Sequence, residues 1–149
     1  MDRRHLQTTT DSRPVAGVRL MLGIIFLMTG AMKLLVPELS QAWHGQLVAA
    51  QLPFIELTRW SVPFIEIFLG AILLIGLHAR LAVLVVMGIM VVATYVHIVV
   101  DDPTLFPLQP SAPIIPAAVI LMSLYVLWKG AGAWSADLKS HHSSSRGNT

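Results

Sequence analysis

The stretch LAVLVVMGIMVVATYVHIVV, residues 81–100, contains no Asp, Glu, Lys or Arg. A helix of about 20 apolar residues is long enough to cross the ~30 Å hydrocarbon core of a bilayer. A strand of a buried parallel sheet would also be apolar, but such sheets need amphipathic covering helices, and the sequence contains none between its apolar blocks. The stretch therefore predicts a membrane-spanning helix.

Three further apolar blocks flank this stretch, at residues 15–35, 60–77 and 114–128. The second of these could begin as early as Pro53. Only three residues separate it from Leu81, which suits a tight helical hairpin. The pattern predicts an all-α fold, a bundle of four transmembrane helices.

The composition fits a chain whose surroundings are largely lipid. Of the 149 residues, 55% are hydrophobic and 12% are charged, whereas a soluble domain carries about 25% charged residues. This argues against a soluble enzyme, a disordered protein and a nucleic-acid binder, and no basic stripe of the kind that grips phosphates is present. The chain has no cysteine, which excludes disulfides, thiolate metal sites and cysteine nucleophiles.

The placement of Lys and Arg predicts the topology. Basic residues fall before the first block, between the second and third blocks, and after the fourth, at Arg3, Arg4, Arg13, Arg80, Lys129, Lys139 and Arg146. Because cytoplasmic loops are enriched in Lys and Arg, we expect a multi-pass protein of a bacterial-type inner membrane with both termini in the cytoplasm. The expected organisation is a cytoplasmic tail (1–14), a membrane domain (15–139) and a disordered cytoplasmic tail (140–149).

The connection between the first two blocks is too long for a simple turn. Ser40 can cap a short helix over residues 40–51, in which Trp43, Leu47 and Ala50 share one face. We expect this helix to lie at the membrane interface, with Trp43 and Trp60 at the level of the lipid head groups.

Four ionisable residues fall within the predicted spans: Arg19, Lys33, Glu66 and His97. Such a group costs ~2.5–3.5 kcal/mol at the middle of a membrane helix, so each needs a partner or a functional role. We therefore predict that these four residues form an intramembrane polar site.

The charged residues share helix faces with glycines. In the first span, the spacing places Gly23 and Gly30 on the stripe of Arg19 and Lys33, and in the second span Gly70 lies on the stripe of Glu66. Glycines in membrane helices let another backbone approach closely, so we expect Gly23, Gly30 and Gly70 to mediate helix packing.

The depth of each group suggests its partner. With a rise of ~1.5 Å per residue, Arg19 lies ~6 Å, Glu66 ~16 Å, His97 ~24 Å and Lys33 ~27 Å from the cytoplasmic ends of their spans. We expect Glu66 to form a structural ion pair with Arg19 or, less easily, with Lys33. The alternative is that Glu66 and Arg19 line a pocket for a small ligand or for protons. His97 is either an interfacial histidine or a quinone or proton contact, and we expect no metal site.

Three motifs resemble those of the DoxX family of small four-helix membrane proteins. The first span matches the pattern R-x3-G-x2-F-x3-G-x2-K-L at Arg19, Gly23, Phe26, Gly30, Lys33 and Leu34. The second block and the turn after it match E-x3-G-x5-G-x3-R-L at Glu66, Gly70, Gly76, Arg80 and Leu81. The segment GAGAWSADL, residues 130–138, resembles the family's ending at Gly130, Gly132, Ser135 and Asp137.

The resemblance covers about residues 15–139 and implies a redox setting. Members of the family include a subunit of a thiosulfate–quinone oxidoreductase and partners in oxidative-stress complexes. An acidic residue often found near the start of the family's fourth helix is replaced here by Pro116 and Ala117.

Three functions follow as hypotheses. The first is an accessory subunit of a membrane redox or oxidative-stress complex, which would need a protein partner or a homo-oligomer in the lipid bilayer. The second is a subunit of a quinone-linked oxidoreductase, for which quinone would be the cofactor. The third is a small-molecule or proton carrier that uses Glu66. The sequence does not decide whether the chain catalyses a reaction.

Overall fold

The computed structural model describes residues 11–108, 110 and 112–138. The predicted tail 140–149 and most of the predicted tail 1–14 lie outside these residues. All regular secondary structure in the described part of the chain is helical, as the sequence predicts. The elements are α2 (Arg13–Leu35), α3 (Pro37–Ala49), α4 (Ile55–Ile75), α5 (Ala79–Val99), the short 3₁₀ helix η1 (Pro103–Leu105) and α6 (Ile114–Lys129).

A proline separates α2 from α3. Because the ring of Pro37 clashes with a helical conformation at the preceding residue, Val36 adopts an extended conformation (φ −105°, ψ 110°). The same proline starts α3, since the first turn of a helix tolerates a missing N–H. The prediction that Ser40 caps this helix was therefore wrong, and Ser40 lies one turn inside it.

Helices α4 and α5 form the predicted tight hairpin. The chain leaves α4 through Gly76 and enters α5 through His78, both in the left-handed conformation (φ 73° and 47°). Helix α4 begins at Ile55, between the two starting points that the sequence allowed.

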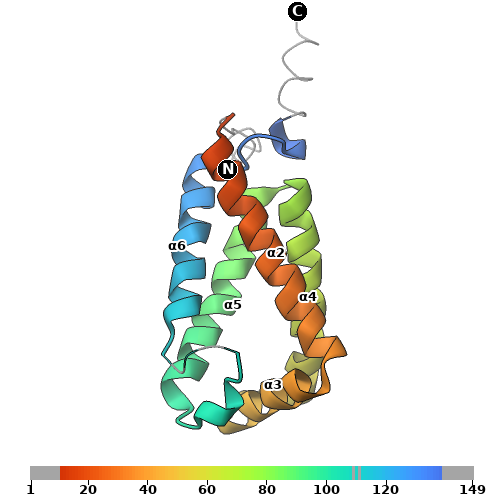
Figure 1. The fold of residues 1–149 in the computed structure, drawn as a ribbon, viewed down its shortest axis with the longest axis vertical. Helices are drawn as coiled ribbons and strands as arrows, with labels where there is room; N and C mark the ends of the chain where they lie inside the picture. The colour runs from red at the N-terminus through yellow and green to blue at the C-terminus, as the bar shows by residue number, and fades with distance from the viewer. Residues whose placement is uncertain (1–10, 109, 111, 139–149) are drawn as a thin grey trace, which may run out of the picture.

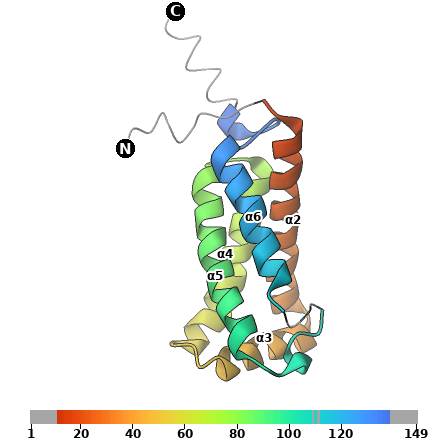
Figure 2. The same cartoon turned by 90° about the vertical axis from the view of Figure 1, so that its left-hand side faces the viewer.

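The four long helices run along the long axis of the molecule, and α3 lies across one end of it (Figures 1 and 2). Helix α2 packs chiefly on α4, and α5 packs chiefly on α6. The core between them consists of fully buried aliphatic and aromatic side chains from all four helices, among them Leu22, Phe26, Leu73, Val83, Val86, Val119 and Val126. The start of α2, the α4–α5 turn and the segment after α6 meet at the end opposite α3 (Figure 1).

Glycines allow α2 and α4 to touch through their backbones. A Cβ atom on Gly30 would lie 2.6 Å from the carbonyl oxygen of Pro63, and one on Gly70 would lie 2.6 Å from the amide nitrogen of Leu27. These separations are too short for a side chain to fit. The close approach brings the faces of α2 and α4 that carry Lys33 and Glu66 together.

The outer surface of the bundle is apolar. Large hydrophobic side chains are exposed along every long helix, including Met21, Met28, Phe64, Phe68, Leu84, Val91 and Leu121. Among the described helices, α2, α4 and α5 are long and apolar enough to cross a membrane, and α6 is a shorter apolar helix. Apolar surface of this extent is expected where lipid rather than water surrounds a protein.

Candidate functional site

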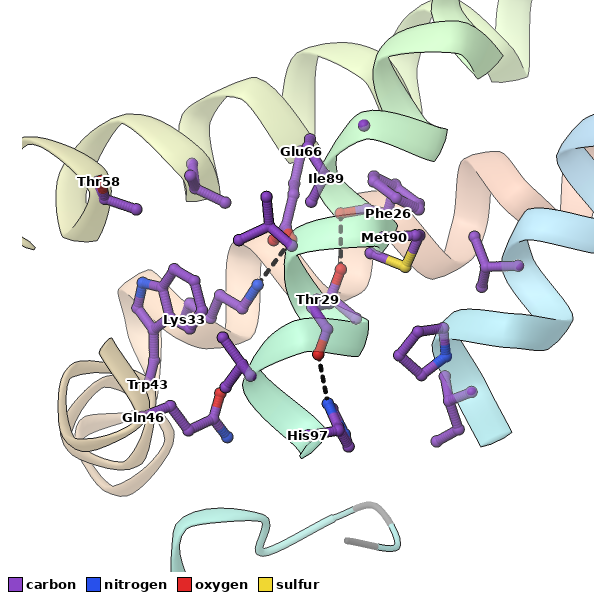
Figure 3. A pocket seen from close by; sticks show the side chains of 18 of the residues that line it. Phe26, Thr29, Lys33, Trp43, Gln46, Thr58, Glu66, Ile89, Met90 and His97 are labelled. Carbon is purple, nitrogen blue, oxygen red and sulfur yellow. Dashed lines mark hydrogen bonds and ion pairs between the residues drawn. The ribbon is translucent and has the colours of Figure 1, made fainter. Parts of the chain in front are cut away.

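A cavity of about 620 Å³ lies inside the bundle at the end that α3 covers. Its walls come from α2, α3, α4, α5 and α6 and are mostly apolar. A few polar side chains interrupt them, namely Thr29, Lys33, Trp43, Gln46, Thr58, Glu66 and His97 (Figure 3). An apolar cavity with a small number of polar groups is the usual form of a small-molecule site.

Lys33 and Glu66 form an ion pair in the wall of this cavity. Lys33 Nζ donates to Glu66 Oε1 at 2.6 Å, and the Glu66 side chain is only 3% exposed. The ammonium group also lies over the ring of Trp43, 4.4 Å from its centroid. The second carboxylate oxygen, Glu66 Oε2, is buried and has no hydrogen-bond partner among the described residues.

His97, on α5, lines the same cavity. Its Nδ1 is 2.8 Å from the carbonyl oxygen of Ala93, one turn earlier, and its ring packs on Phe106 with centroids 4.5 Å apart. The residue is 9% exposed, and Nε2 has no hydrogen-bond partner within the described part of the chain. Two residues that line the cavity, on different helices, thus each keep one fully buried polar atom without a partner among the described residues.

Helix α3 closes the cavity through Trp43 and Gln46, two residues outside the polar site that the sequence predicts. Pro63 has no N–H and therefore leaves the carbonyl of Arg59 without its helical donor. Trp43 Nε1 donates to that carbonyl at 3.3 Å, and Gln46 Nε2 donates to the carbonyl of Leu105. The spacing of Trp43 and Gln46 on one face of a helix next to a proline-containing span is the signal that could have identified them.

Arg19 lies away from the cavity and does not pair with Glu66. Its guanidinium group is fully buried and donates to the carbonyls of Leu73 and Leu74 at the end of α4. It also donates to three carbonyls after α6, those of Ala131 (2.7 Å), Ala133 (3.3 Å) and Trp134 (3.4 Å). The predicted Arg19–Glu66 ion pair was wrong, because backbone carbonyls satisfy Arg19 and Lys33 reaches Glu66.

The carbonyls that Arg19 binds explain its position. The last carbonyls of a helix lack intrahelical donors and carry partial negative charge, so a buried cation is favourable there.

The segment after α6 also stabilises the start of α5. The Asp137 carboxylate accepts from the amides of His78 (2.8 Å) and Ala79 (3.0 Å), where the helix dipole favours an anion.

The structure thus brings Lys33, Glu66 and His97 together and places Arg19 in a separate structural site at the other end. Among the described residues, no group of three or more His, Asp or Glu side chains could hold a metal ion. The wall of the cavity thus combines one ion pair, one histidine and mostly apolar side chains.

Comparisons with known proteins identify the family. The DoxX family model matches residues 15–98, a range that contains Arg19, Lys33, Glu66 and His97. No curated protein and no solved structure matches the chain. The matched range covers more than half of the 149 residues. It contains most of α2, all of α4 and all of α5 except its last residue. These are the three helices of spanning length. The chain therefore belongs to the DoxX family of membrane proteins.

Proposed function

We propose that this protein is a four-span subunit of a membrane redox complex that binds a quinone-class ligand in the cavity beside α3. The observation that carries the proposal is the apolar cavity itself, whose wall contains the Lys33–Glu66 ion pair and His97. A ligand with a polar head and an apolar body matches a wall in which a few polar groups interrupt apolar side chains.

The walls of the cavity fit such a ligand. Phe26, Ile89 and Val119 offer apolar contacts to a ring, while the remaining N–H groups of Lys33 and Gln46 can donate to its carbonyl oxygens. A quinone supplies the capacity to take up two electrons and two protons. The chain's own residues would orient the ring and exclude water from it.

The cavity also has a route to the lipid. Val85 and Val92 line the cavity although they are 48% and 46% exposed, and Gly88 lies between them on the same face of α5. The cavity therefore opens sideways along α5. A ligand that is dissolved in the membrane could enter there without passing through water.

The absence of cysteine from the sequence supports an accessory role. Because it has no cysteine, thiol redox chemistry and thiolate-held clusters would have to come from a partner protein. We propose that this partner, or a second copy of the chain, packs on the apolar outer surface within the bilayer.

The proposed orientation places both termini in the cytoplasm of a bacterial-type cell. Arg13, Arg80 and Lys129 lie at the end of the bundle where α2 begins and α6 ends, and α3 lies at the other end. The excess of basic residues favours the cytoplasm for the first end. The cavity then lies toward the outer surface of the membrane.

Ligand binding can be tested with the purified protein in lipid nanodiscs. Organic extracts of the protein should contain quinone in proportion to the chain, and a benzoquinone with a decyl tail should bind to the emptied protein. Gly88→Leu should weaken this binding at least tenfold, because a Cβ there meets no neighbouring atom and the side chain would fill the lateral opening.

Gly17→Leu is the matched control, since Gly17 is equally free of neighbours but does not line the cavity. Absence of quinone from the extracts together with absence of binding would refute the proposal. Equal effects of the two substitutions would show that the ligand binds elsewhere.

The cavity permits one alternative, a proton or small-molecule carrier that uses Glu66. The Lys33–Glu66 ion pair favours it, since it puts an ionisable carboxylate in the wall of the cavity. Flux of protons across proteoliposomes that disappears in Glu66→Gln, without quinone binding, would support this carrier function.

A further inference from the structure

We infer that the end of the bundle opposite α3 binds the head group of an anionic phospholipid, at a site formed by Arg80 of α5 with Trp128 and Lys129 of α6. We call these three residues the α5–α6 site. The inference is independent of the proposed function, since none of the three residues lines the cavity, which lies at the other end of the bundle.

The α5–α6 site brings cations from two helices to one tryptophan. Helix α5 begins and α6 ends at the same end of the bundle, and the two helices pack side by side (Figure 2). Arg80 Nη2 donates to the carbonyl oxygen of Trp128 at 3.3 Å, and Lys129 Nζ lies over the ring of Trp128, 4.2 Å from its centroid. An anion that contacts both side chains therefore gains from a guanidinium and an ammonium group at once.

The surroundings of the α5–α6 site suit a lipid. Trp128 is 73% exposed, and tryptophan is enriched where the hydrocarbon of a bilayer meets the head groups. Leu124 and Leu121, one and two turns earlier on the same face of α6, are exposed, and so is Leu84, one turn after Arg80 on α5. A phospholipid with its phosphate at the α5–α6 site would lay its acyl chains along these apolar faces.

The distribution of charge favours an anionic partner at this end of the bundle. The connecting segments at the α3 end carry four acidic residues: Glu38, Glu56, Asp101 and Asp102. At the basic end, the described part of the chain contains Asp11 and Asp137. Asp137 is only 5% exposed, and its carboxylate accepts from the amides of His78 and Ala79. Anionic lipids of the cytoplasmic leaflet attract basic residues next to membrane helices, and the proposed orientation places this end in the cytoplasm.

The first test compares two lipids on the unmodified chain. Native mass spectrometry of the full chain in detergent measures the affinity of a phosphatidylglycerol and of a phosphatidylcholine with the same acyl chains. We expect the phosphatidylglycerol to bind at least tenfold more tightly, because each basic residue near an anionic head group contributes about a fivefold preference. Equal affinities for the two lipids would overturn the inference.

Two arginines that both lie near a tryptophan provide matched variants. Arg80→Gln should weaken the binding of phosphatidylglycerol about fivefold and that of phosphatidylcholine less than about twofold. Arg59→Gln is the control, because Arg59 lies over the ring of Trp60, 5.5 Å from its centroid, on α4 and outside the α5–α6 site. It should change the binding of either lipid less than about twofold. The same loss of phosphatidylglycerol binding in both variants would show that only net charge matters, and the site would be wrong.

Two further variants separate charge from structure. Arg80→Gln/Lys129→Gln should reduce the preference for phosphatidylglycerol to less than about threefold, whereas Arg80→Lys keeps the charge and should retain most of the preference. A double variant that keeps the full preference would also overturn the site.

A soluble anion distinguishes a lipid from a free phosphate. Glycerol phosphate at the concentration of the lipid should leave phosphatidylglycerol bound, since it lacks the acyl chains that contact the apolar faces of α5 and α6. Displacement at that concentration would assign the site to a soluble phosphate and not to a lipid. The comparisons of the two lipids and of glycerol phosphate use the unmodified protein, so the inference can fail even if a variant does not fold.

Discussion

The buried polar and charged groups at the two ends of the bundle differ in how completely they are hydrogen-bonded. At one end, the guanidinium of Arg19 donates to five backbone carbonyls and lies outside the cavity. At the other end, Glu66 and His97 are nearly as deeply buried, yet each keeps one atom without a hydrogen bond among the described residues, in the wall of a cavity. Burial alone therefore does not tell whether a charged or polar group has all of its hydrogen bonds satisfied.

The largest effect on stability should come from removing Arg19, whose guanidinium group binds backbone carbonyls at the end of the bundle opposite α3. Arg19→Leu would leave the carbonyls of α4 and of the segment after α6 without their donor, and we expect a loss of about 3–5 kcal/mol in the free energy of unfolding. Thermal or denaturant unfolding in detergent measures this loss. Arg13→Leu removes an exposed charge from the same helix and should cost little. Similar losses in the two variants would contradict the structural role of Arg19.

Substitutions at the cavity end should affect stability differently, because both partners of the Lys33–Glu66 ion pair can be replaced together. Lys33→Leu leaves the buried Glu66 carboxylate alone and should cost about 2–3 kcal/mol, whereas Glu66→Leu should cost less because Lys33 is 21% exposed and can reach the interface. The double variant Lys33→Leu/Glu66→Leu should recover most of the stability.

The double variant Arg19→Leu/Glu66→Leu serves as the comparison. Its losses should add, since the two residues belong to separate sites. If this second double variant recovered stability instead, the result would indicate an ion pair between Arg19 and Glu66, which the structure does not contain. The same unfolding measurements decide between the two pairings.

A smaller effect on stability is expected where the backbones of α2 and α4 are in contact, between the two ends of the bundle. Gly70→Ala would place a Cβ 2.6 Å from the amide nitrogen of Leu27, and we expect a loss of about 1–3 kcal/mol from overpacking. Gly17→Ala on the outer face meets no neighbour and should be neutral or gain up to about 1 kcal/mol of helix propensity. A neutral Gly70→Ala would show that the two backbones are not in contact.

The smallest effect concerns Asp102, an exposed acid outside the spans whose partners are local. Hydrogen bonds from the side chain and then the backbone of Thr104 lower the pKa of Asp102 below its ordinary value. A lowered folded-state pKa means that this contribution to stability is present above the unfolded pKa and is lost as the pH falls through the folded pKa.

Thr104→Val removes the side-chain donor and should raise the pKa of Asp102 part of the way to its ordinary value, while the backbone bond remains. Carboxyl chemical shifts in an NMR titration measure the change. The same titration in Thr94→Val should leave Asp102 unaltered. An unchanged pKa in Thr104→Val would assign the lowering to another cause.

The sequence was sufficient to find the helices and the unusual residues. Apolar runs of membrane length identify the spans, and the cost of ionisable groups in lipid singles out Arg19, Lys33, Glu66 and His97, although it does not separate Arg19 from the three that line the cavity. The partner of Glu66 could not be found in this way. The helical rise places Glu66 at a depth between Arg19 and Lys33, and it says nothing about which way a flexible side chain turns.

The choice of partner depends on a segment that is far away in the sequence. Arg19 is held by the carbonyl of Ala131, 112 residues later, and by the end of α4, so it is not available to Glu66. In the sequence, residues 130–138 stand out only as a family motif. Their carbonyls and the Asp137 carboxylate acquire a role when the folded chain returns them to the start of α2 and the α4–α5 turn.

Hydrophobic length and the energetic cost of charge in lipid act on each segment separately, so the amino-acid order alone determined an all-helical membrane protein with a few buried ionisable groups. Pairing, hydrogen bonding and the presence of a cavity depend on how segments distant in the chain pack together. Only the tertiary structure could therefore decide that Arg19 binds backbone carbonyls at one end of the bundle, while Lys33, Glu66 and His97 line a cavity at the other end.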